Sequence, residues 1–198
     1  MNFNKLTVKA QEAIAEAQNL ARGAGNPELA PEHVLLALLR QEGGIVAPIL
    51  NKLGVNPGVV EAEVAAAVAK FSKVGGASAE PGVSSSLRKI FDAAFKSAEQ
   101  FGDEYVSTEH LLLAVADAKE TTASQVLRRH GVVPDAVLKA LQSRDRDRSA
   151  IRARQARLSA YMDAQVNPAE ARFPAEVQEN RRRGNPWIPT DTIEALKE

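Results

Sequence analysis

Apolar residues recur along most of the chain at the three- and four-residue intervals of an α-helix, and glycine or proline separates successive segments. Two segments depart from this amphipathic pattern. In 30–39 (APEHVLLALL) and 107–116 (STEHLLLAVA), six apolar residues follow one another. Because such helices lack a polar face, we expect both to be largely surrounded by other helices. The pattern predicts helices over 6–22, 31–41, 47–53, 57–71, 87–101, 107–116, 123–130 and 134–141.

Start signals support these two central helices. Ser107 is a good N-cap residue, whose hydroxyl can accept a hydrogen bond from a backbone N–H of the first turn. Pro31 suits the first helical position of the other segment, where its missing N–H costs nothing. Glu32 and Glu109 place a negative charge in the first turn, which the helix dipole favours. Ala30 is a poorer cap than Ser107, so the earlier helix starts less firmly.

The two central segments belong to an internal duplication with a constant offset of 77 residues. That offset, without a gap, also pairs Ala17 with Ala94, Ala21 with Ala98, Gly25 with Gly102, His33 with His110, Leu50 with Leu127, Gly54 with Gly131 and Pro57 with Pro134. Such a register indicates two copies of one supersecondary unit. We therefore predict an all-α domain with pseudo-two-fold symmetry over residues 1–143, built from a duplicated four-helix repeat.

Four regions follow from the duplication. The repeats occupy 1–71 and 84–143, and the connector 72–83 (SKVGGASAEPGV) consists mostly of small residues, so we expect a mobile linker there. Each repeat is close to the size at which a lone core is marginal, so docking of the two copies adds needed buried area. The fourth region, 144–198, has an arginine-rich start and an irregular remainder, which we expect to be partly helical and weakly packed.

Composition excludes several function classes. The chain has 198 residues and no cysteine, which excludes disulfides and thiolate chemistry and favours a reducing compartment. No segment has the long apolar run of a membrane span, and the start lacks the apolar core of a signal peptide. The formal net charge is zero, which argues against general nucleic-acid binding. We expect a cytoplasmic protein.

The repeated motifs resemble a known family. Each copy carries E-H-[LV]-L-L-A followed by L-x-x-x-G-V-x-P, after a first helix and a glycine-ended loop. This arrangement is similar to the Clp N-terminal (Clp R) repeat domain, most closely its ClpB disaggregase branch. The resemblance implies a substrate- or partner-docking module that binds unfolded or aggregated polypeptide, or a Clp-type ATPase or adaptor, and does no chemistry. The sequence contains no G-x-x-x-x-G-K-[ST] phosphate-binding loop, so we expect no bound nucleotide or other cofactor.

The candidate substrate contacts are Thr7, Asp103 and Glu109, with Glu104 as a further residue at the rim of a groove. Any surplus apolar surface between the copies would form the peptide-binding patch. Thr7 and Glu109 each have an alternative role. Thr7 can be the cap of the first helix, and Glu109, like Glu32, can stabilise a helix start rather than form a carboxylate pair for acid–base work.

His33 and His110 occupy equivalent positions beside a glutamate, which raises the possibility of a metal or catalytic site. No further ligands at suitable spacing accompany either histidine, and a metal site needs several converging ligands. We therefore favour a structural hydrogen-bonding role for both. The sequence predicts no metal site and no catalytic residue.

The tail allows other interpretations. The arginines of 144–157 suggest nucleic acid, but two interleaved aspartates and few aromatics favour a solvated helix face or a spacer. Arg181–Arg183 with Trp187 is a second nucleic-acid candidate. Residues 152–198 resemble the N-terminal helical segment of an acyl-CoA dehydrogenase. The alternative function is thus an inactive fragment or fusion of that FAD-dependent enzyme, and a third is a translated pseudogene.

Overall fold

The structure is a computed structural model that describes residues 3–73, 80–144, 153 and 155–156. Contacts divide the chain into two units, Met1–Leu141 and Gln142–Glu198. The fold below is that of the first unit. The tail predictions, namely the weakly packed segment, the two arginine-rich candidates and the resemblance over 152–198, fall almost entirely outside the described residues.

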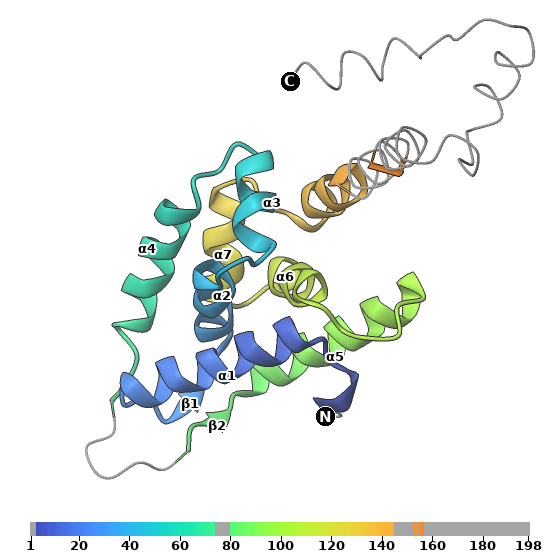
Figure 1. Cartoon of the computed structure of the whole chain (residues 1–198). Coiled ribbons are helices and arrows are strands. Elements are labelled where there is room, and N and C mark those ends of the chain that lie inside the picture. Colours follow the sequence, from blue (N-terminus) through green and yellow to red (C-terminus); the bar gives the residue numbers. More distant parts are fainter. Residues whose placement is uncertain (1–2, 74–79, 145–152, 154, 157–198) are drawn as a thin grey trace, which may run out of the picture. The chain divides into compact units, whose positions relative to one another are not determined.

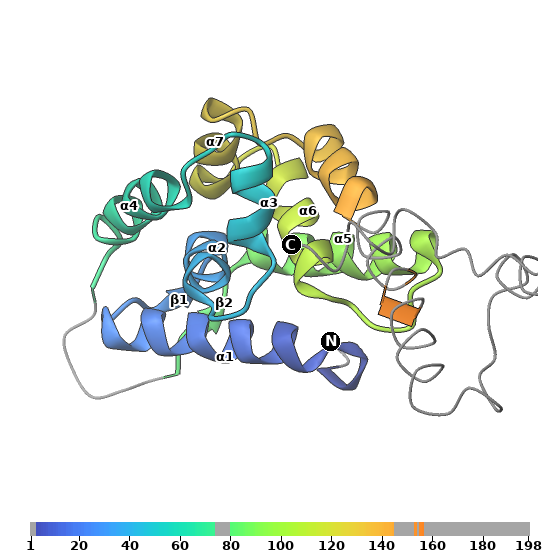
Figure 2. The ribbon, with the colours of Figure 1, turned by 45° about the horizontal axis from the view of Figure 1, so that its top comes forward.

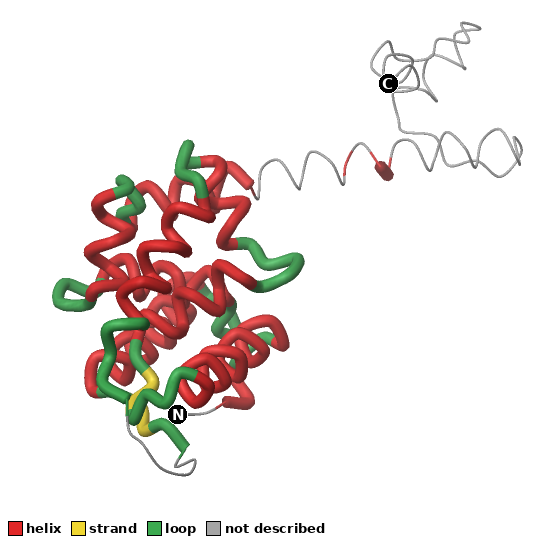
Figure 3. Tube along the Cα trace, turned by 90° about the vertical axis from the view of Figure 1, so that its left-hand side faces the viewer, coloured by secondary structure: helices red, strands yellow, loops and turns green. Residues whose placement is uncertain are grey.

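The first unit is mostly helical, as the apolar pattern predicts (Figure 1; Figure 3). A short 3-10 turn (Phe3–Lys5) precedes the first helix. The first repeat contains α1 (Val8–Gly23), α2 (Pro31–Arg40), α3 (Val46–Lys52) and α4 (Pro57–Val68). The second contains α5 (Ser85–Phe101), α6 (Thr108–Asp117), α7 (Thr122–Arg129) and the helical residues 134–141.

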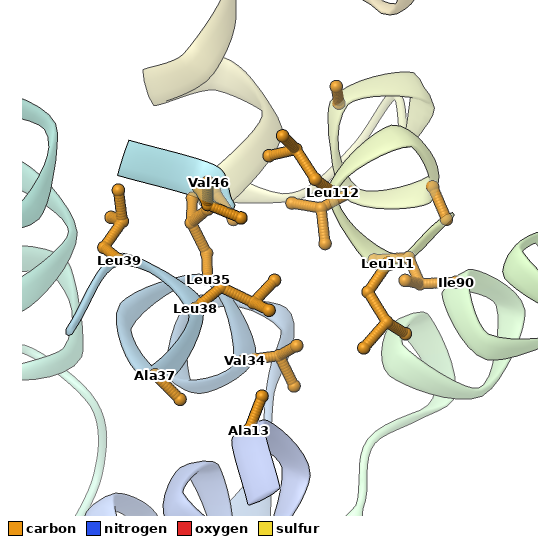
Figure 4. Packing of buried hydrophobic residues seen from close by; sticks show 14 of the residues in the cluster. Ala13, Val34, Leu35, Ala37, Leu38, Leu39, Val46, Ile90, Leu111 and Leu112 are labelled. Atoms are coloured by element: carbon orange, nitrogen blue, oxygen red, sulfur yellow. The ribbon is translucent and has the colours of Figure 1, made fainter. Parts of the chain in front are cut away.

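Helices α2 and α6 form the centre of the unit. Helix α2 contacts α1, α3 and α4 from its own repeat, and α5, α6 and α7 from the other (Figure 2). Its residues are buried up to Leu39, and the exposed Arg40 ends it. Figure 4 shows Val34, Leu35 and Leu38 of α2 facing the leucines of α6 across one continuous core. The predicted burial of both central helices is confirmed.

Two short parallel strand pairings join the repeats. Strand β1 (Glu28–Leu29) pairs with β2 (Gly82–Val83), with Leu29 opposite Val83. An isolated bridge joins Leu6 to Val106. The offset of 77 converts Leu6 into Val83 and Leu29 into Val106, so each pairing is the pseudo-symmetric copy of the other. Strand β2 lies in the segment predicted as a mobile linker, where pairing with β1 orders its last residues.

Glu32 also joins the repeats. Its side chain is 4% exposed, and its Oε1 accepts a hydrogen bond from the backbone N–H of Ala123, in the first turn of α7, at 3.0 Å. The sequence predicts that Glu32 stabilises the start of its own helix. The structure shows in addition that it satisfies a buried donor at the start of a helix in the other repeat.

Candidate binding site

Thr7 lies where the N-terminal segment meets the loop between α5 and α6. Its hydroxyl accepts a hydrogen bond from Ala10 N at 3.3 Å, so the predicted cap role is confirmed. Its backbone N–H donates to Val106 O at 3.0 Å, and Val106 N donates to Lys5 O at 2.7 Å. These bonds hold the start of α1 against residues 102–107, and we call this place the first junction.

His110 holds the same loop from the inside. Its Nδ1 accepts the backbone N–H of Ser107 at 3.0 Å, which leaves the proton on Nε2, and Nε2 lies 3.2 Å from Asp103 Oδ2. Burial lowers the pKa of the His110 imidazole, and the negative charges of Asp103 and Glu109 oppose that shift. Glu109 is half-buried, and its Oε2 accepts from Thr108 Oγ1 at 3.3 Å.

The three predicted contact residues therefore lie around one structural feature. Thr7 bonds to Val106, Asp103 lies in the same loop, and Glu109 is in the first turn of the helix that follows it. The Asp103 side chain is 57% exposed. Glu104 is exposed, Thr7 and Glu109 are half-buried, and so the carboxylates of the loop are the most accessible members of the set.

Three residues next to those of the first junction have exposed apolar side chains. Val8 is 69% exposed, Phe101 50% and Tyr105 45%, and the Phe101 ring lies 5.8 Å from that of His110. We call Val8, Phe101, Asp103 and Tyr105 the junction patch. The sequence pattern does not single out its apolar members, because Val8 begins α1, Tyr105 lies in the loop after α5, and Phe101 continues the apolar stripe of α5. The only sequence signal near these residues is the glycine after Phe101, which indicates where α5 ends.

The pseudo-symmetric second junction buries the counterpart of Asp103. There Ser84 N donates to Leu29 O at 3.0 Å, as Thr7 N does to Val106 O. His33 Nε2 lies 3.0 Å from Asn26 Oδ1, and Asn26, the counterpart of Asp103, is only 4% exposed. Two residues after α4 cover this place: Ser72 O accepts from Asn26 Nδ2 at 3.1 Å, and the Phe71 ring lies 5.5 Å from His33.

Ser107, His110 and Asp103 also form a serine–histidine–carboxylate chain, because Ser107 Oγ is 2.9 Å from His110 Nδ1. A serine nucleophile needs a ring nitrogen whose lone pair can take its proton. Here Nδ1 accepts the backbone N–H of Ser107, as His33 Nδ1 accepts that of Ala30 at 3.1 Å. Ser107 is the N-cap residue, but its hydroxyl contacts the ring rather than a backbone N–H. Both histidines serve helix starts.

Surface hollows lined by described residues also lie away from the junctions. A hollow of about 330 Å³ lies between α1 and α2, and one of about 390 Å³ between α5 and α6. Adding 77 to each residue that lines the first hollow gives a residue that lines the second, so that Lys9 corresponds to Ser86 and Glu42 to Lys119. In the first hollow, Gln41 Nε2 donates to Lys9 O at 2.9 Å. The second hollow has Ala118 in the position of Gln41, and alanine has no side-chain donor for such a bond. A third hollow of about 480 Å³ lies between α1, α2 and α4.

Within the described residues, no group of three or more histidine, aspartate and glutamate side chains is placed to hold a metal ion. No helix among those residues is long and apolar enough to cross a membrane.

Comparison with known proteins decides the family. The sequence profile of the Clp repeat (R) N-terminal domain matches residues 5–130. The chain belongs to this family. The chaperone protein ClpB of Corynebacterium diphtheriae is 44% identical over 132 residues, which is 66% of this chain and 15% of that protein. The sequence-based resemblance of the repeats is confirmed.

Solved structures agree on the Clp N-terminal domain fold. The Hsp104 N-terminal domain from Candida albicans superimposes with a TM-score of 0.63 at 23% identity, over 71% of this chain and 91% of that one. A ClpV N-domain in complex with a VipB peptide superimposes with a TM-score of 0.52 at 21% identity, over 63% and 78% of the respective chains.

The predicted resemblance of residues 152–198 to an acyl-CoA dehydrogenase is not supported by the comparisons. ClpB of Propionibacterium freudenreichii is 31% identical in an alignment that covers 95% of this chain, so the alignment includes most of 144–198. The comparisons give the acyl-CoA dehydrogenase resemblance no support. This chain spans 24% of that ClpB and 15% of the corynebacterial one, so it corresponds to a small part of each relative.

Proposed function

We propose that the chain is the substrate- or partner-binding module of a Clp/ClpB-type chaperone and that the junction patch binds exposed apolar segments of unfolded or aggregated polypeptides. One observation carries the proposal: the first of two pseudo-symmetric junctions exposes Val8, Phe101 and Tyr105, whereas at the second Phe71 and Ser72 contact the buried His33 and Asn26. Large exposed apolar side chains gathered at one place mark an interaction site more often than scattered ones.

The relatives support this proposal without specifying the ligand. Several are chaperones by name, and a ClpV N-domain of the same fold has been solved with a peptide. Thr7, Asp103 and Glu109 are proposed as residues of the site, with Asp103 as the exposed polar contact. We also propose a Clp-type ATPase or adaptor as a further partner, and a cytoplasmic protein that uses no nucleic acid, membrane, cofactor or catalytic residue of its own. The division into repeats 1–71 and 84–143 joined by 72–83 is part of the same proposal.

Weak binding follows from the shape of the patch. Its apolar side chains are 45–69% exposed, and none of them lines the three hollows described above. Sites of this kind bury little ligand area, so a dissociation constant of about 1 μM or weaker, near −8 kcal/mol, is expected.

The test is a binding measurement on matched surface variants. Val8→Ser removes an exposed apolar side chain of the patch, and Val59→Ser removes one from α4, where Val59 is 46% exposed. Fluorescence anisotropy with a labelled, permanently unfolded polypeptide should show a loss of roughly three- to tenfold in affinity for Val8→Ser. Val59→Ser should bind like the parent. Equal affinities for all three proteins would overturn the assignment of the patch.

A further inference from the structure

The two buried histidines occupy the same position in the two repeats but face different partners. His110 Nε2 lies 3.2 Å from the carboxylate of Asp103, and His33 Nε2 lies 3.0 Å from the amide of Asn26. Both rings are almost fully buried, and each accepts a backbone N–H through Nδ1. The duplication thus supplies one charged and one neutral version of the same contact, and only the charged version lies in the junction patch.

Protonation of His110 changes what Asp103 presents to solvent. With a neutral ring, Nε2–H donates one hydrogen bond to Asp103, which keeps its full negative charge. Protonation adds the second proton at Nδ1, which can then donate to Ser107 Oγ at 2.9 Å in place of accepting the Ser107 N–H. The protonated ring and Asp103 form an ion pair of zero net charge. The charged groups that act on the ring are Asp103 in the α5–α6 loop and Glu109 on α6 itself, and the neighbouring ring from α5 is the uncharged Phe101.

We propose that His110 is the positioning residue of Asp103 and that it makes the preference of the junction patch for cation-bearing apolar segments depend on pH. This inference rests on the proposed function, because it names the ligand charge and the regulation of the same site. Asp103 and Glu104 are exposed carboxylates beside Phe101 and Tyr105, which gives the patch a negative and aromatic character. Its complement is an apolar segment that carries arginine or lysine.

Ligand and proton then compete for one carboxylate. A guanidinium bound at Asp103 disfavours protonation of His110, and by reciprocity a protonated His110 weakens the guanidinium contact. Since Asp103 is more than half exposed, the effect should be that of a surface ion pair, about two- to fivefold in affinity. A segment without cations should show no such change.

The experiment uses two labelled peptides of about ten residues, both rich in leucine and phenylalanine, one with arginines and one with glutamines in their place. Anisotropy is measured with the full chain at about pH 7.5 and at a lower pH below the His110 midpoint found by NMR titration, after circular dichroism has shown it folded at both. Asp103→Asn gives the first junction the amide chemistry of the second. The control, Asp92→Asn, makes the same charge change at an exposed position of α5.

The parent and Asp92→Asn should bind the arginine peptide two- to fivefold more weakly at the lower pH, and Asp103→Asn should bind it equally at both. The glutamine peptide should bind every protein without pH dependence. In addition, NMR titration should show a lower pKa for His110 in Asp103→Asn, since Asp103 raises it, and no change for His33.

If the glutamine peptide binds while Asp103→Asn keeps the pH dependence of the parent, the role of His110 is refuted and the binding function stands. An unchanged His110 pKa in Asp103→Asn would likewise refute the role of His110 and leave the binding function standing. Failure of both peptides to bind at either pH would overturn the proposed function, and this inference with it.

Discussion

Replacement of Glu32 by alanine should destabilise the fold far more than loss of a surface carboxylate. Glu32 Oε1 is the acceptor for the buried N–H of Ala123, 91 positions away in the chain. A hydrogen bond to a charged acceptor contributes about 1.5–3 kcal/mol, and its loss leaves the Ala123 donor buried and unpaired. We expect a decrease of about 2–3 kcal/mol in the free energy of unfolding, and a fall in Tm of roughly 5–10 °C.

Urea denaturation followed by helical circular dichroism measures this effect, and two further variants sharpen it. Glu12→Ala removes an exposed carboxylate that pairs with Lys9 at 2.9 Å and should cost about 0.5 kcal/mol or less. Glu32→Gln keeps an oxygen acceptor without the charge and should fall between the two. A Glu32→Ala protein within about 0.5 kcal/mol of Glu12→Ala would refute the claim that this bond couples the repeats.

Two other predictions concern stability. Burial lowers the pKa of both His33 and His110, so the unfolded chain takes up protons near its ordinary value of 6.5 before the folded one does. Stability should therefore be full above that value and decrease as pH falls below it, by up to about 1.4 kcal/mol per pH unit for each histidine. Urea midpoints across this range measure it, and a flat profile would contradict it. Gly102 ends α5 with φ at +73°, so Gly102→Ala should lower the free energy of unfolding by about 1 kcal/mol, whereas an unchanged melting temperature would contradict this.

The sequence predicts those parts of the fold that depend on local pattern. The apolar runs of α2 and α6 indicate buried helices, and the offset of 77 indicates two copies, because both signals lie within or between contiguous segments. The pairing of Leu6 with Val106 and of Leu29 with Val83 depends on how the two copies pack, which no local spacing encodes. The contact of Glu32 with Ala123 is hidden for the same reason.

The residues of the candidate site were also only partly predictable from the sequence. Thr7 has a signal because a threonine before an apolar-periodic segment is a plausible cap, and the structure confirms that role. Val8 and Tyr105 have none, since a single apolar residue beside a cap or turn fits many environments. The structure shows that both are exposed, and the second junction, where Phe71 lies beside the buried His33, provides the contrast.

The central claim is that the first junction binds polypeptide and the second does not. Backbone amide NMR on the full chain, titrated with a permanently unfolded polypeptide, tests it most directly. The largest shift changes should occur at Thr7, Val8 and residues 101–109, with small changes at Asn26, His33 and Ser84. Equal changes at both junctions, or changes confined to other surfaces, would contradict the account.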